Sequence, residues 1–144
     1  MLQPPYKDTM APPNAFKVPK QVKRQALRGV KLRRAKFKGG TKTGWKRGEQ
    51  LSGPDPRISL QDLRVIRGWF ARHGPDAENG GTSYPGFKKW IKDGCPGEKR
   101  RYHAWERNKY RGAVAYLLWG GDAAYKWLRT PEIKKALKRF SVER

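Results

Sequence analysis

Apolar residues recur at helical spacing through the second half of the chain. The first run has four of them at intervals of three or four residues: Leu60, Leu63, Ile66 and Phe70. This spacing places them on one face of a helix. Ser59 stands directly before the run and Asp62 three residues later, which is the spacing of a capping box. The pattern predicts a helix that ends at about residue 73, before Gly74-Pro75.

Further helical segments follow, separated by glycine and proline. After a polar, Gly-rich loop at 75–83, Pro85 suits the first turn of a short helix that carries Phe87, Trp90 and Ile91. A longer helix is expected from about residue 99 or 104 to Trp119, where Gly120-Gly121 ends it.

The last part of the chain has its own start signals. Asp122 is expected to cap a segment that reaches Leu128, and Thr130-Pro131 is typical of the start of a helix over 131–140. In that helix an apolar stripe lies opposite a stripe of Lys and Arg. No alternation of convincing strand length is present, so the fold class is all-α.

The N-terminal third has a different pattern. Residues 1–16 are rich in proline and are expected to be extended. Val22, Ala26 and Val30 lie four apart, which allows a short helix around 20–36 on binding, although Gly29 weakens it by about 1 kcal/mol relative to Ala. We therefore expect an extended, basic, Pro-rich arm over 1–42 and a small Trp-rich helical domain over 43–140.

The arm owes its basic character to residues 17–47, which hold thirteen Lys or Arg and no acid. A block of this kind repels itself until an anionic partner screens it. It predicts contact with phosphates or with acidic protein surfaces, without base recognition. The candidate binding residues are Lys17, Lys20, Lys23, Arg24, Arg28, Lys31, Arg33, Arg34, Lys36, Lys38, Lys42, Lys46 and Arg47.

Composition alone would favour disorder. Leu, Ile, Val and Phe make up 25 of the 144 residues, and the net charge is +22. Six Trp and six Tyr argue for a folded domain instead, since eleven of these twelve lie after residue 44. We expect most of the tryptophans to build the core, because aliphatic residues are few. One or two at the surface would be contact residues that stack on bases or anchor an interface.

Other classes of protein find little support. No apolar run approaches the length of a membrane span, and the N-terminus has no apolar stretch typical of a signal peptide. The single Cys95 excludes an internal disulfide framework and fits a reducing compartment. Gly39-Gly40-Thr41-Lys42 lacks the order and the context of a phosphate-binding loop. Cys95, His73 and His103 are too scattered to predict a metal site, so we expect no catalytic residues, metal or cofactor.

Three short segments have a familiar order: Thr43–Gly48, Trp69–His73, and Leu118–Asp122 followed by Trp127. This order resembles a Trp-rich module, with the word Trp-Gly-Gly-Asp, of virion-associated proteins from tailed phages and large double-stranded DNA viruses. The resemblance implies a non-enzymatic role in the virion. From the residues themselves we expect a structural corner formed by Trp45, Trp69, Phe70, Trp119, Gly120, Gly121, Asp122 and Trp127.

The expected function is that of a minor capsid or cement protein. Its helical module would dock on major and other minor capsid proteins within the virion. Its basic arm would touch acidic surfaces or packaged double-stranded DNA. The alternative is a sequence-nonspecific nucleic-acid-binding protein, either DNA-condensing or ribosome-associated, since a pI of 10.6 and an acid-free segment are typical of that class.

Overall fold

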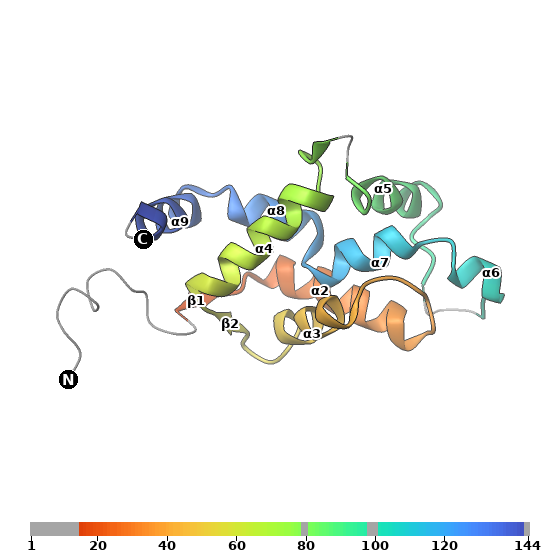
Figure 1. Cartoon of the computed structure of the whole chain (residues 1–144). Coiled ribbons are helices and arrows are strands. Elements are labelled where there is room, and N and C mark those ends of the chain that lie inside the picture. Colours follow the sequence, from red (N-terminus) through yellow and green to blue (C-terminus); the bar gives the residue numbers. More distant parts are fainter. Residues whose placement is uncertain (1–14, 79–80, 98–100, 143–144) are drawn as a thin grey trace.

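The computed structural model describes residues 15–78, 81–97 and 101–142, with side chains as far as Lys138. Within these residues the fold is an all-α small domain, as predicted (Figure 1). The chain forms eight helices there, α2 (Lys20–Arg34), α3 (Lys42–Leu51), α4 (Leu60–His73), α5 (Tyr84–Lys92), α6 (Ala104–Arg107), α7 (Arg111–Leu118), α8 (Gly121–Leu128) and α9 (Pro131–Val142). Two short strands, β1 (Phe16–Lys17) and β2 (Arg57–Ile58), pair antiparallel with Phe16 opposite Ile58.

The helix α2 is part of the core, and the expectation of an extended arm is wrong for this segment. Val22, Ala26, Val30 and Leu32 are all buried, against α3, α7 and α8. The apolar stripe noted in the sequence therefore folds within the chain itself, and no partner is needed to order it. The charged side chains of α2 do not prevent this burial, because they extend from the other sides of the helix. Residues 1–14 of the expected arm lie outside the described residues.

Gly29 is the point of closest approach between α2 and α7. A Cβ atom at this position would lie 2.8 Å from the backbone nitrogen of Leu118 and 3.1 Å from the carbonyl carbon of Leu117. The glycine that weakens the isolated helix is thus the one that lets the two backbones meet. This contact couples the basic N-terminal segment to the hydrophobic C-terminal half.

Aromatic rings fill the centre of the domain, which explains how a chain with few aliphatic residues folds. Tyr116 is fully buried on α7, and its ring lies 4.6 Å from that of Phe87 and 5.5 Å from those of Phe70 and Tyr84. The pairs with Phe70 and Phe87 are edge-on or tilted, which are favourable geometries for aromatic rings. Its hydroxyl donates a 2.6 Å hydrogen bond to the carboxylate of Asp122.

The predicted helix boundaries hold in part. Ser59 and Asp62 form the expected capping box of α4. Residues 42–51, for which no helix was predicted, form α3. The expected single helix before Trp119 is divided into α6 and α7 by a turn at 108–110. The side chain of Tyr110 turns there to donate a 2.8 Å hydrogen bond to Asp93.

None of the helices in the described ranges is long and apolar enough to cross a membrane.

Candidate nucleic-acid interface

The thirteen candidate binding residues fall into two groups, and the first group serves the fold. The guanidinium of Arg28 lies 5.2 Å from the ring centre of Trp90 and donates a 3.3 Å hydrogen bond to the carbonyl oxygen of Cys95. The guanidinium of Arg33 lies 5.6 Å from the ring centre of Trp45. Both arginines are half-buried, so their charge stabilises contacts within the chain.

Arg47 is the third arginine used internally. Its Nη1 lies 3.0 Å from Oδ1 of Asp62, and its guanidinium lies 5.3 Å from the ring centre of Trp119. Its side chain is only 12% exposed. The sequence could not separate these three arginines from the other cations, because their spacing from Trp90, Trp45 and Trp119 follows no local pattern.

The second group is exposed, and its centre is the outer face of α2. Lys20, Arg24, Lys31 and Arg34 all lie at the surface. At 100° per residue these positions fall within about 80° of one another, on the side opposite the buried residues. Arg34 lies 14 positions after Lys20, which is about 21 Å along the helix. We refer to these four residues as the α2 stripe.

Exposed cations continue on both sides of the α2 stripe. Lys23 is half-buried on the same helix. The remaining candidates are exposed and lie before α2, after it, or on α3: Lys17, Lys36, Lys38, Lys42 and Lys46.

The ion pairs found among the described residues lie elsewhere. They include the carboxylates of Asp55, Asp62, Asp76 and Asp93. Their basic partners are Arg47, Arg57, Lys89, Lys109 and Arg129, none of which belongs to the α2 stripe. The helix α2 itself contains no acid. Within the described ranges, the α2 stripe is therefore a row of positive charge that no carboxylate pairs with.

The segments that carry the resemblance meet at one corner of the core. The rings of Trp69 and Trp119 stack with their centres 5.2 Å apart. A Cβ atom on Gly44 would lie 3.2 Å from Nε1 of Trp119, and one on Gly48 would lie 2.5 Å from Leu118. The glycines of α3 thus make room for the tryptophan and leucine of α7. Trp69, Phe70 and Trp119 are buried, while Trp45 and Trp127 are partly buried against the same core.

Asp122 does not cap α8 as expected. Gly120 is the residue before this helix, with φ +104°, and Gly121 opens the helix with φ +61°. Both conformations favour glycine over residues with a side chain. The Asp122 carboxylate instead accepts the hydrogen bond from Tyr116, so it satisfies a buried hydroxyl.

The charge environment shifts several pKa values. Partial burial opposes ionisation of Asp62, but hydrogen bonds and charge from Arg47, with help from Ser59 and Gln50, hold the pKa of its carboxyl below the ordinary value. The hydrogen bond from Tyr110 does the same for the pKa of Asp93. In turn, burial and the bond to Asp93 raise the pKa of Tyr110 to about 12.

The residues considered for metal binding or nucleophilic catalysis are not assembled into a site. Nδ1 of His73 lies 2.9 Å from the hydroxyl of Thr82, while burial and the neighbouring Arg72 lower the pKa of His73. Cys95 is half-buried and His103 is exposed on another segment. In the part of the chain that the structure describes, no three His, Cys, Asp or Glu side chains group as metal ligands would.

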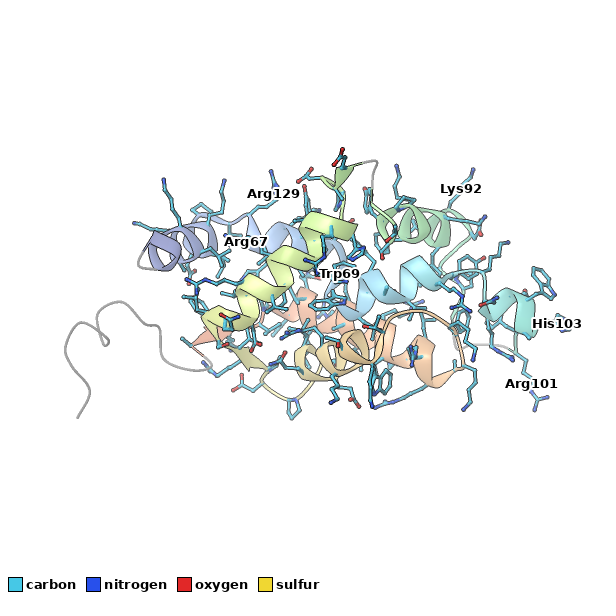
Figure 2. All side chains as sticks on the ribbon, in the orientation of Figure 1. Arg67, Trp69, Lys92, Arg101, His103 and Arg129 are labelled. Carbon is cyan, nitrogen blue, oxygen red and sulfur yellow. The ribbon has the colours of Figure 1, made fainter. Side chains whose placement is uncertain are left out.

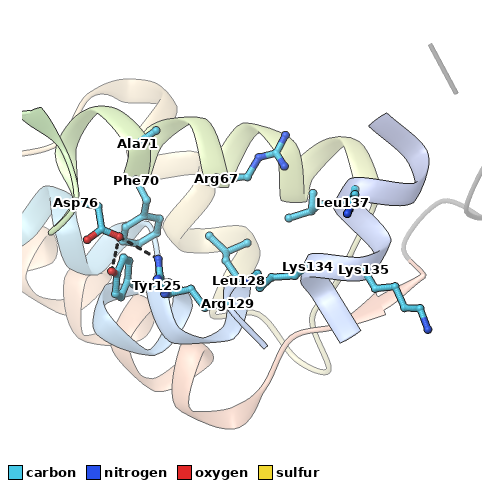
Figure 3. A pocket seen from close by; sticks show the side chains of 11 residues that line it. Arg67, Phe70, Ala71, Asp76, Tyr125, Leu128, Arg129, Lys134, Lys135 and Leu137 are labelled. Carbon is cyan, nitrogen blue, oxygen red and sulfur yellow. Dashed lines mark hydrogen bonds and ion pairs between the residues drawn. The ribbon is translucent and has the colours of Figure 1, made fainter. Parts of the chain in front are cut away.

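A groove of about 890 Å³ lies between α4, α8 and α9 (Figure 3). Its floor includes the apolar side chains of Phe70, Leu128 and Leu137. The carboxylate of Asp76 lies at its edge and accepts hydrogen bonds from Tyr125 and from Arg129. The groove was not predicted from the sequence. The one feature of the sequence that pointed to it was the stripe of Lys and Arg on the last helix. The cations that line it are Arg67, Arg129, Lys134, Lys135 and Lys138.

Comparison with protein-family models, with curated proteins and with solved structures gave no match.

Proposed function

We propose that this chain is a non-enzymatic minor structural protein of a large DNA virus or phage particle, and that it binds packaged double-stranded DNA through the outer face of α2. The observation that supports DNA binding is the α2 stripe: four exposed cations in a row, on a helix fixed in the core. This surface replaces the extended arm as the site of phosphate contact.

The form of the α2 stripe favours a regular polyanion. The row is about 21 Å long and holds only Lys and Arg, which bind phosphates without selecting bases. A duplex presents phosphates continuously along such a length, so it needs no matching surface shape. An acidic protein would need carboxylates placed to match a single row of four charges.

The setting in a virion is supported by the resemblance of Thr43–Gly48, Trp69–His73 and Leu118–Asp122. In the folded chain these segments supply core contacts, as in the stacking of Trp69 on Trp119, and this agrees with a structural role. The groove between α4, α8 and α9 supplies a second surface, with an apolar floor and a cationic rim. We propose it as the face that docks on major or other minor capsid proteins.

The alternative function, a nonspecific nucleic-acid-binding protein that condenses DNA or accompanies ribosomes, would use the same α2 stripe. Mass spectrometry of purified particles from an infected culture separates the two. The chain is expected at a stable ratio to the major capsid protein, and its absence from particles that retain their DNA would favour the alternative.

Binding by the α2 stripe is tested with full-length protein, because a truncation before α3 would remove a core helix. The test variant carries Lys20→Gln, Arg24→Gln, Lys31→Gln and Arg34→Gln. The control variant loses the same charge from exposed positions on α4, α5 and α8: Arg72→Gln, Lys88→Gln, Lys92→Gln and Lys126→Gln. Circular dichroism checks that both variants remain folded.

The readout is the affinity for a blunt duplex of arbitrary sequence over a range of salt concentrations. If four phosphate contacts are lost, the slope of log K against log salt becomes shallower by about 3 to 4 in the test variant. The control variant is expected to keep most of the wild-type slope. Equal changes in the two variants would show that net charge alone drives binding, and would refute the assignment to α2.

A further inference from the structure

Trp105 differs from every other tryptophan of this chain. Its side chain is 65% exposed. Trp69, Trp90 and Trp119 are buried, and Trp45 and Trp127 are packed against the core. An exposed indole leaves a large apolar surface in water, which costs free energy unless a ligand covers it.

The helix that carries Trp105 is held firmly. Nη1 of Arg107 donates a 2.6 Å hydrogen bond to the carbonyl oxygen of Tyr102, and the backbone N–H of Lys38 donates a 2.9 Å bond to the carbonyl oxygen of Arg107. At the other end, Oε1 of Glu106 accepts a 2.9 Å bond from the N–H of His103. Trp105 is therefore carried by a helix that hydrogen bonds hold in place, next to the segment that follows α2.

Basic side chains lie near this indole, together with the acidic Glu106 on the same helix. Nζ of Lys109 lies 5.9 Å from the ring of Trp105, and also 3.9 Å from the carboxylate of Asp93. Arg101 and His103 are exposed and project outward beside α6, at the end of the molecule opposite α9 (Figure 2).

The same end of the molecule also carries the continuation of the α2 stripe. Lys36 and Lys38 are both exposed, and the backbone bond from Lys38 to Arg107 joins their segment to α6. A nucleic-acid strand that leaves the α2 stripe would thus meet α6 and Trp105 next.

The surroundings of Trp105 do not form an apolar patch. No residue of α6 is buried, and the other large hydrophobic residues that are exposed in the described ranges, Val65 and Ile91, lie on α4 and α5. A protein or membrane contact would call for a wider apolar area. A single exposed aromatic ring with basic side chains nearby matches the way that proteins bind unpaired bases.

We propose that Trp105 stacks on an unpaired nucleobase, so that this end of the molecule binds single-stranded DNA or the single-stranded end of a duplex. The proposal rests on the proposed function for the neighbouring duplex contact. Each ring that stacks on a base commonly contributes enough to change affinity by about tenfold.

The test uses three DNA probes and full-length protein. The probes are a blunt duplex, the same duplex with a thymidine tail, and the same duplex with an abasic tail of equal length and charge. Trp105→Ala removes the ring, Trp105→Phe keeps a smaller one, and Ile91→Ala removes an exposed apolar side chain from α5 as a control.

Trp105→Ala is expected to weaken binding of the thymidine-tailed duplex by about tenfold, with Trp105→Phe in between. The affinity of Trp105→Ala for the blunt and abasic-tailed duplexes is expected to stay close to wild type. The Ile91→Ala control is expected to bind all three probes as the wild type does. An equal loss on all three probes, or no loss on the thymidine tail, would overturn the proposal.

This test is separable from that of the proposed function. If the α2 variant binds blunt duplex as well as the wild type does, the duplex assignment fails. A loss specific to the thymidine tail in Trp105→Ala would still support base stacking.

Discussion

Replacement of Gly29 by alanine tests whether α2 belongs to the core. The substitution would place a Cβ atom 2.8 Å from the backbone nitrogen of Leu118. Restoring an ordinary contact of about 3.5 Å requires α2 and α7 to separate by about 0.7 Å. Backbone atoms cannot rotate away as a side chain could, so the whole contact must adjust.

Two opposing effects decide whether Gly29→Ala raises or lowers the free energy of unfolding. Alanine in place of glycine favours the helix by about 1 kcal/mol. Overpacking of a tight contact costs typically about 1 to 3 kcal/mol, and a clash with backbone belongs in the upper part of that range. We therefore expect Gly29→Ala to lower the free energy of unfolding by about 1 to 2 kcal/mol, which corresponds to a melting temperature lower by about 4 to 8 °C.

Gly68 on α4 supplies the matched control. A Cβ atom there would meet only Nη1 of Arg72, at an ordinary 3.5 Å. Gly68→Ala is therefore expected to raise the free energy of unfolding by up to about 1 kcal/mol. Thermal and urea unfolding followed by circular dichroism measure both variants. A Gly29→Ala protein as stable as the wild type, or more stable, would refute the placement of α2 in the core.

Two further predictions concern the dependence of stability on pH. Asp62 has a lowered pKa in the folded chain, so its contribution is present above the unfolded value of about 3.9 and is lost as the pH falls below it. Asp62→Asn should thus be less stable than wild type by about 1 kcal/mol at neutral pH, and in urea unfolding this gap should narrow as the pH falls below about 3.9; a constant gap would contradict this. Tyr110 has a raised pKa of about 12, so its contribution is present below about pH 10 and is lost between that value and 12. Tyr110→Phe should therefore lose less stability over that alkaline interval than wild type does, and an unchanged decline would count against the bond to Asp93.

Helices with strong local signals were predictable from the sequence. The capping box of Ser59 and Asp62 and the apolar spacing after it are local features, and α4 follows them. Gly120-Gly121 was also correctly placed as the end of a helix, because glycine in left-handed backbone is a local signal as well.

The role of α2 was not predictable from local pattern. Its buried stripe consists of small residues, and seven cations surround it in the sequence. The residues that complete the contact, Leu117 and Leu118, come almost ninety positions after Gly29. Similarly, Gly44 and Gly48 suggest a loop until their neighbours Trp119 and Leu118 are known, and then they explain how α3 fits against α7.

The candidate interface was predictable as a region and not residue by residue. The acid-free segment 17–47 marked the place, but the internal use of Arg28, Arg33 and Arg47 depends on Trp90, Trp45, Trp119 and Asp62. From the sequence we expected one or two tryptophans at the surface without knowing which, and the fold identifies Trp105 as exposed.

A nuclear magnetic resonance titration of the full-length protein with a short blunt duplex tests the central claim most directly. Before DNA is added, the amides of residues 20–34 are expected to be dispersed, and those of 23–34 to be protected from exchange, because α2 is in the core and its backbone hydrogen bonds begin at Lys23. On titration, the largest shift changes are expected at Lys20, Arg24, Lys31 and Arg34. Unprotected amides over 23–34, or shift changes confined to the groove of α4, α8 and α9, would contradict the account.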